Sequence, residues 1–212
     1  MTDHDPTDLG AVYDRIAAHF SKTRAYPWSE VTDFLADRSG SVGIDLGCGN
    51  GRHLEHLASS VDRAVGIDLS REILREAASR RREAGFDADL VRGAATSIPI
   101  RNDAVDVALY IATMHHLPTR AARIESLEEI ARILGPNGVG LVSVWSTTHD
   151  RFDRESGFDA EIDWTLPNGE TVPRFYHVYD PEEFERDLEA SSLAVVESVV
   201  SSGNCFATVG SE

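Results

Sequence analysis

The sequence predicts an α/β fold, built on an open, mostly parallel seven-stranded sheet that closes with an antiparallel hairpin. Through the middle of the chain, short apolar runs alternate with segments of helical spacing, the pattern of βαβ units in a parallel sheet. Near the end, apolar runs at 194–200 and 205–209 flank Ser201-Ser202-Gly203-Asn204, which is typical of a hairpin turn. A length of 212 residues suits a single domain.

The predicted elements follow in regular order. Residues 1–40 precede the sheet, with helices expected at Leu9–Phe20 and Trp28–Arg38. The five parallel strands are expected at Val42–Leu46, Ala64–Asp68, Ala88–Val91, Val105–Ile111 and Val139–Trp145. Helices are expected at Gly51–Ser59, after the capping residue Ser70, at Thr119–Leu134 and at Pro181–Ala190. A turn at 135–138 is expected to end the third of these helices. Residues 147–173 are polar and acidic, and they indicate an insertion into a domain that spans 41–212.

The composition is strongly acidic. Against 36 acidic residues there are 20 basic ones, and Lys22 is the only lysine, so the net charge is −16. The acidic residues are spread along the whole chain, which favours a surface adapted to high salt, and hence a halophilic source, over a protein that simply avoids polyanions.

Composition also indicates where in the cell the protein acts and whether it binds a metal. No apolar stretch approaches the roughly 20 residues of a membrane helix, and the polar, acidic residues 1–5 are unlike a secretory signal, so a cytoplasmic protein is expected. Cys48 and Cys205 alone provide neither a disulfide framework nor a zinc site, so no metal is expected.

A glycine cluster follows the first predicted strand. Gly47, Gly49 and Gly51 stand where a strand turns into a helix, a place where backbone N–H groups surround a ligand. The spacing is one residue shorter than that of the dinucleotide-binding fingerprint, which suits a cofactor without pyrophosphate. Asp45 would meet an ammonium group, and Asp68, at the end of the second strand, can accept both hydroxyls of a ribose. The alternative is a tight turn followed by an unrelated acid.

These residues resemble those of the class I S-adenosylmethionine-dependent methyltransferases, a Rossmann-like family, over about residues 40–145. The resemblance implies S-adenosylmethionine as cofactor and S-adenosylhomocysteine as product, with the loop around the methionine part and Asp68 on the ribose. The third-strand motif, often Gly-Asp-Ala in the family, reads Gly93-Ala94-Ala95, so the acid expected near the adenine is missing. The expected cofactor-binding residues are Tyr13, Asp45, Gly47, Cys48, Gly49, Asn50, Asp68, Leu69, Ala95 and Ile111.

Three further motifs narrow the resemblance. They are Val12-Tyr13-Asp14-x-Ile16-Ala17-x-His19-Phe20-Ser21-x-Thr23-Arg24-x-x-Pro27-Trp28, Ile111-Ala112-x-x-His115-His116 and Arg174-Phe175-Tyr176-His177-x-Tyr179. Together they resemble the tRNA wobble-uridine (U34) 5-carboxymethyl methyltransferases. The resemblance implies a helical lid at 1–40, the tRNA anticodon loop as substrate, and methyl esterification of 5-carboxymethyluridine.

The chemistry of that reaction can be derived from the acceptor. A carboxylate is already a nucleophile at neutral pH, so the enzyme needs alignment and exclusion of water rather than a general base. Cations and hydrogen-bond donors that hold the anion are expected among His19, Arg24, His116, Arg174, Tyr176 and His177. Structural alternatives remain open: Trp28, Tyr176 and Tyr179 could pack the core, one of His115 and His116 could be structural, and Arg80-Arg81-Arg82 could be a solvated helix end.

A protein partner is also implied. In this fold the third strand lies at the sheet edge, where unpaired backbone groups can accept a strand from another chain. The resembling enzymes pair there with a small zinc-binding activator, so a heterodimer through about Phe86–Arg92 is expected, with any zinc on the partner. The alternatives are a small-molecule methyltransferase of the quinone or lipid type, which the acidic charge would suit, and a non-catalytic cofactor-binding subunit.

Overall fold

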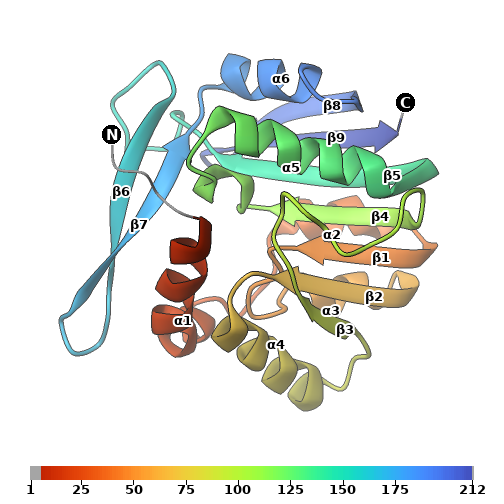
Figure 1. The fold of residues 1–212 in the computed structure, drawn as a ribbon, viewed down its shortest axis with the longest axis horizontal. Helices are drawn as coiled ribbons and strands as arrows, with labels where there is room; N and C mark the ends of the chain where they lie inside the picture. The colour runs from red at the N-terminus through yellow and green to blue at the C-terminus, as the bar shows by residue number, and fades with distance from the viewer. Residues whose placement is uncertain (1–5, 212) are drawn as a thin grey trace.

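A computed structural model of the chain describes residues 6–211 and shows one central seven-stranded sheet (Figure 1). Its strand order is β3-β2-β1-β4-β5-β9-β8, with the first five parallel and β9 antiparallel to both β5 and β8. The predicted fold class is confirmed. The strands are β1 Gly40–Leu46, β2 Val61–Asp68, β3 Asp89–Arg92, β4 Val105–Ile111, β5 Leu134–Trp145, β8 Leu193–Ser201 and β9 Asn204–Ser211. The first five residues of the expected lid lie outside the described part.

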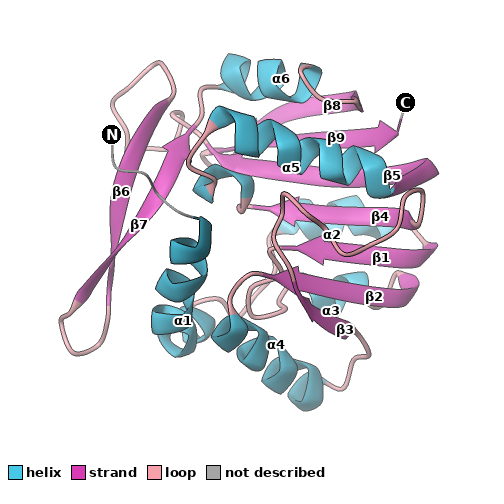
Figure 2. Ribbon diagram, viewed as in Figure 1, coloured by secondary structure: helices cyan, strands magenta, loops and turns pink. Residues whose placement is uncertain are grey.

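Helices cover both faces of this sheet. The helices are α1 Pro6–Lys22, α2 Ser29–Ala36, α3 Leu54–Leu57, α4 Arg71–Ala84, α5 Arg120–Ile133 and α6 Pro181–Glu189, with a 3-10 turn, η1, at Met114–His116. In Figure 2, α4, α5 and α6 lie in front of the sheet and α2 and α3 behind it. One apolar core packs Leu127 and Ile130 of α5 on the sheet, and a second packs Phe34 and Leu35 of α2 on the other face. None of the helices within 6–211 is long and apolar enough to cross a membrane.

Local chemistry explains where the helices begin. The hydroxyl of Ser70 accepts a hydrogen bond from the Ile73 N–H at 3.1 Å, which confirms it as the cap of α4. The helix after the glycine cluster is shorter than predicted, because Gly51 has a φ of +81°, which a right-handed helix does not allow. The strand β5 begins earlier than predicted, and the predicted turn at 135–138 is a bulge between the Val105–Leu134 and Val107–Val139 pairs.

The polar segment after β5 leads into a second, smaller sheet. Residues Phe158–Thr165 and Thr171–Val178 form the antiparallel pair β6 and β7, which has its own small core around Ile162, Tyr176 and Val178. Figure 1 shows this hairpin and α1 beside the carboxyl ends of the parallel strands. The contacts of Trp164 with His19 and Phe20 join the hairpin to α1. The two elements therefore cover the sheet edge where ligands bind in open α/β folds.

Candidate active site

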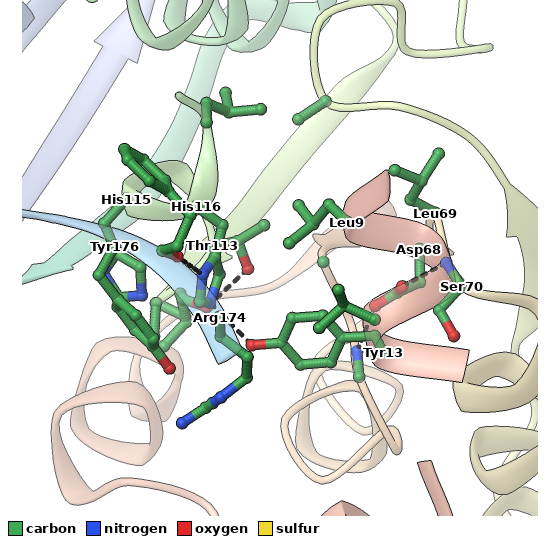
Figure 3. Close-up of a pocket in the computed structure, with 18 of the residues that line it drawn as sticks. Leu9, Tyr13, Asp68, Leu69, Ser70, Thr113, His115, His116, Arg174 and Tyr176 are labelled. Carbon is green, nitrogen blue, oxygen red and sulfur yellow. Dashed lines mark hydrogen bonds between the residues drawn. The ribbon is translucent and has the colours of Figure 1, made fainter. Parts of the chain in front are cut away.

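A cavity of about 940 Å³ lies at the carboxyl ends of the parallel strands and is bordered by α1 and the β6–β7 hairpin. Its walls come from the glycine loop, the ends of β2 and β4, α1 and the hairpin. Figure 3 shows Tyr13 of α1 between two groups of lining residues, Asp68 to Ser70 on one side and His115, His116, Arg174 and Tyr176 on the other. The cavity therefore has two ends of different chemistry, and Tyr13 stands at their junction.

The glycine loop is shaped by positive backbone angles. Gly47, Gly49 and Gly51 all have φ between +55° and +81°, a region that residues with a side chain seldom adopt. A Cβ on Gly47 would also lie 2.7 Å from Thr113 Cβ, and nearer still to the tip of that side chain. The N–H groups of Gly47 and Cys48 both donate to the Ile67 carbonyl, at 2.7 and 3.0 Å, which fixes the loop on β2. Only glycine allows β1 to turn this tightly past the end of β4.

Two carboxylates lie near this end of the cavity; Asp68 lines its wall, whereas Asp45 does not. Asp68 accepts the Gly49 N–H at 3.0 Å and the Ser70 N–H at 2.9 Å, and burial raises its pKa to about 6. Asp45 is buried below the loop, and within residues 6–211 its Oδ2 has no hydrogen-bond partner. Burial, together with the nearby Asp68, raises the pKa of Asp45 to about 7. A buried carboxylate with one unpaired oxygen fits a ligand that brings a cation, such as the ammonium group of a methionine moiety.

The end of β4 delivers two histidines to the other end. Ala112 has a φ of +51°, unusual for a residue with a side chain, and its N–H donates to Ser143 at both the carbonyl and the hydroxyl. The chain then turns through Thr113 into η1, which carries His115 and His116 into the cavity wall. This local strain sits at the site, as is common for residues that place functional groups.

Hydrogen bonds assign the protonation of both imidazoles. His116 Nδ1 donates to the Phe175 carbonyl at 2.9 Å, so its Nε2 accepts the Tyr13 hydroxyl at 2.8 Å. His115 Nδ1 accepts the Trp145 N–H at 2.9 Å, so the proton of its neutral ring is on Nε2. Burial lowers the pKa of His116 to about 4 and holds that of His115 well below its usual range. Both rings are therefore neutral at pH 7 and act as fixed donors and acceptors rather than as cations.

The positive charge at this end comes from arginine. The Arg174 guanidinium lies 4.8 Å from the Trp164 ring centre and 5.1 Å from that of Tyr176, and its buried Nε has no partner in the described chain. Arg24 lies 5.3 Å from the Phe20 ring centre and 5.5 Å from that of Trp164. Neither arginine forms an ion pair within residues 6–211, although both line the cavity. Two such cations in an aromatic wall provide a binding site for an anion.

Most of the residues predicted from the sequence meet in this cavity. Those that line it are Tyr13, Arg24, Gly47, Cys48, Gly49, Asn50, Asp68, Leu69, Ala95, Ile111, His116, Arg174 and Tyr176. His19 does not line it; its Nδ1 accepts the Trp164 indole N–H at 3.0 Å and so supports the wall from behind. Gly93, Ala94, Ala95 and Thr96 form one wall without an acidic side chain, as the sequence indicated.

His177 was expected to position the substrate, and the structure places it outside the cavity wall. Its Nδ1 lies 2.7 Å from Asp159 and its Nε2 lies 2.9 Å from Glu183, so both ring nitrogens are occupied by carboxylates. Alternation explains this, because neighbouring residues on β7 point to opposite faces of the hairpin. Tyr176 faces the cavity, and His177 faces the acidic residues of β6 and α6 instead.

The sequence pattern missed several lining residues. Arg52 follows the glycine loop directly, and a cation at that place was the available signal. Trp164 belongs to a stretch expected to be an insertion. An indole in an otherwise polar, acidic segment was the signal that this side chain packs against another part of the protein. Thr113 is positioned by the turn at Ala112, and no sequence pattern predicts that turn.

The chain is similar to known proteins in sequence and in fold. The sequence pattern of the methyltransferase domain family matches residues 44–138, which contain the glycine loop and β4. A protein of Encephalitozoon cuniculi named as a methyltransferase is 30% identical over 205 residues, covering 93% of this chain and 92% of that protein. The mouse tRNA (carboxymethyluridine(34)-5-O)-methyltransferase ALKBH8 is 36% identical over 148 residues, or 69% of this chain. The match covers 21% of the mouse protein, so this chain spans only a small part of that relative.

A solved structure shares the fold. The complex of the Haloferax volcanii Trm112 methyltransferase activator with a methyltransferase contains a chain that superposes with a TM-score of 0.71. The match covers 96% of this chain and 97% of the other, at 18% sequence identity. At that identity the likeness is one of fold.

Proposed function

The chain belongs to the methyltransferase family, and from this membership we propose that it methylates the carboxylate of 5-carboxymethyluridine at wobble position 34 of tRNA, with S-adenosylmethionine as methyl donor. The observation that carries this proposal is the pairing of two chemically distinct ends in one cavity. One end has a glycine loop with Asp68 beside it; the other has two arginines that form no ion pair within residues 6–211, set in an aromatic wall. A sugar-bearing cationic cofactor suits the first end, and an anionic base suits the second.

At the cofactor end, each residue has a defined task. Asp45 accepts the ammonium group, the backbone of Gly47 to Asn50 encloses the methionine part, and Asp68 accepts the ribose hydroxyls. Leu69 and Ala95 provide apolar surface for the adenine, which backbone groups recognise in the absence of an acid at Ala94. When bound, S-adenosylmethionine supplies a methyl group on a positively charged sulfur.

At the acceptor end, the residues hold and orient an anion. Arg174 and Arg24 bind the carboxymethyl group, with the planar guanidinium of Arg174 fixed by stacking on Trp164 and Tyr176. The neutral His115 and His116 donate and accept at fixed positions without adding charge. Because the acceptor oxygen is ionised at neutral pH, no residue needs to remove a proton. The rate enhancement comes from alignment and from the removal of water.

The roof of the cavity excludes that water. We propose that, of the expected lid at residues 1–40, the helix α1 acts as a lid on the domain formed by residues 41–212, while α2 stays packed on the far face of the sheet. Its α1 closes against the hairpin through the Trp164–His19 hydrogen bond and through an ion pair between Arg15 and Glu170. These contacts are few and polar at their outer end, so the roof can open to admit a base.

A tRNA assay tests this proposal. Purified protein and labelled S-adenosylmethionine are incubated with tRNA from cells that lack this modification step, and the label is located by nuclease mapping. We expect label at position 34 of tRNA that carries the carboxymethyl group and none in matched tRNA with unmodified uridine. Label elsewhere in the tRNA, or methylation of an apolar quinone with tRNA left unlabelled, would contradict the proposal and favour a small-molecule methyltransferase.

The sheet edge supports a partner of the Trm112 type. β3 is an edge strand, and its Leu90 and Val91 are half-buried, so a strand added there would extend the sheet and its apolar faces. The solved complex that shares this fold contains such an activator. Hydrogen exchange of the co-expressed pair should slow at Asp89–Arg92, whereas slowing at the opposite edge strand β8 would contradict the assignment.

Two features of the surroundings belong to the same proposal. An acidic surface with a charge of −16 supports a high-salt source, in which mobile ions screen the self-repulsion of the carboxylates. A tRNA substrate supports action in the cytoplasm.

A further inference from the structure

An aromatic side chain stands almost fully in solvent beside the cavity. Tyr26 lies in the connection between α1 and α2, and its side chain is 82% exposed. The residues around it border the cavity, since Arg24 and Trp28 both line it. A tyrosine at such a position contributes nothing to the core, and its ring is free to stack on a ligand that approaches the cavity.

The connection that carries Tyr26 is nevertheless fixed. Asn50 of the glycine loop donates to the Arg24 carbonyl at 2.9 Å, and Arg80 of α4 donates to the Ala25 carbonyl at 2.8 Å. Arg52 donates to the carbonyl of Tyr26 itself at 3.4 Å. Three consecutive carbonyls are thus bound by side chains from two other elements. The exposed ring is held on a stable support, which lowers the entropy cost of binding through it.

Cations gather on this side of the cavity in an otherwise acidic protein. Lys22, Arg24, Arg52 and Arg80 surround the connection, and of these only Arg80 has an ion-pair partner in the described chain, Glu55. Burial lowers the pKa of Arg52 to about 10; repulsion from Arg24 and Arg80 acts in the same direction, and attraction to Asp45 opposes it. Like charges held this close in the free protein favour a polyanion that neutralises them.

Asp163 of β6 also lines the cavity and is exposed. A phosphate backbone is repelled by a carboxylate and attracted to the cations around Tyr26. The charges therefore favour the approach of a nucleic acid along the connection that carries Tyr26.

We propose that Tyr26 stacks on the nucleotide next to the target base, while Lys22, Arg52 and Arg80 hold the neighbouring phosphates. This inference rests on the proposed function, because a wobble base that enters the cavity must leave its stack and thereby exposes a face of its neighbour. The Tyr26 ring replaces the lost stacking partner. It is thus a positioning residue for RNA, separate from the residues that hold the methyl donor and the carboxylate.

Fluorescence of a modified RNA hairpin tests the stacking directly. The probe is an anticodon stem-loop with 2-aminopurine at position 33 or 35, titrated with the full-length protein, because stacking quenches this base. We expect quenching at one of the two positions, its loss in Tyr26→Ala and its retention in Tyr26→Phe, which keeps the ring. Stacking on an aromatic ring is worth roughly 1–3 kcal/mol, so Tyr26→Ala should weaken RNA binding about 5- to 150-fold. Arg186→Ala, on the distant helix α6, is the matched control and should bind RNA like the wild type.

Salt titrations test the phosphate contacts. For single-stranded RNA, each lost contact should lower the slope of log affinity against log salt by about 0.7, so Lys22→Gln and Arg52→Gln should each do so. Calorimetry with S-adenosylmethionine should give the same affinity for Tyr26→Ala as for the wild type.

The outcomes separate this inference from the proposed function. Normal tRNA methylation by the wild type, with quenching and affinity unchanged in Tyr26→Ala, would overturn the inference alone. A wild type that methylates no tRNA but loses its quenching in Tyr26→Ala would support the docking site and overturn the proposed function. A wild type that binds no RNA at all would overturn both.

Discussion

Replacing Gly47 with alanine tests how tightly the cofactor loop is built. Gly47 has a φ of +71°, which costs a residue with a side chain about 1–2 kcal/mol. The added Cβ would also lie 2.7 Å from Thr113 Cβ, and overpacking of this kind costs about 1–3 kcal/mol. Together the two effects predict a loss of about 2–5 kcal/mol in the free energy of unfolding, a large part of the stability of a typical domain.

Gly85 provides the matched control. It ends α4 with a φ of +75°, and a Cβ there would meet nothing within 4 Å, so Gly85→Ala carries the strain without the clash. We expect Gly85→Ala to cost about 1–2 kcal/mol and to leave cofactor affinity unchanged. In the double variant Gly47→Ala/Thr113→Gly the clash is removed, so the two changes should couple favourably by about 1–3 kcal/mol.

Urea denaturation measures these free energies, and calorimetry with S-adenosylmethionine measures the loop. Gly47→Ala should lose most of its cofactor affinity, because relief of the clash moves the loop backbone or the end of β4. A cost no greater than that of Gly85→Ala, with cofactor affinity intact, would refute the packing described for this loop.

Three other predictions follow from the site. Arg174→Gln should lower kcat/KM for tRNA by roughly 10- to 150-fold, because a hydrogen bond to a charged group contributes about 1.5–3 kcal/mol. An unchanged kcat/KM would contradict the assignment of Arg174 to the anion site. Burial raises the pKa of Asp45 to about 7 from an ordinary value near 4 in the unfolded chain, so the contribution of Asp45 to the stability of the cofactor-free protein is lost as pH rises from about 4 to 8. In urea titrations the stability of the wild type relative to Asp45→Asn should therefore fall over this range, and a constant difference would contradict the burial effect. Raising KCl from about 0.1 M to 2 M should raise the thermal midpoint because it screens the −16 charge, and a falling midpoint would contradict adaptation to salt.

The sheet and the cofactor loop could be predicted because their signals are local. Alternating apolar runs determine strands, and the glycines at 47, 49 and 51 mark the turn after β1 whatever surrounds them. The edge position of the third strand followed from the fold and is confirmed.

The acceptor end could be predicted only in part, because it depends on contacts between distant segments. The motif containing Arg174, Tyr176 and His177 was recognised as a unit, but strand alternation turns His177 away from Tyr176 and toward two carboxylates. Trp164 reaches the cavity because the hairpin folds over α1, a long-range packing choice that no local pattern encodes. Tyr26 appeared unremarkable in the sequence, and its exposure could be seen only once the loop around it was in place.

The chemical form of the transferred methyl group tests the central claim most directly. Methyl esters are cleaved by mild alkali to methanol, whereas methyl groups on nitrogen or carbon are stable to it. We predict that tRNA labelled by this protein releases most of its label as volatile methanol after mild alkaline treatment, and that the remaining nucleoside at position 34 is 5-carboxymethyluridine. Label that stays on the tRNA through this treatment would contradict methylation of a carboxylate.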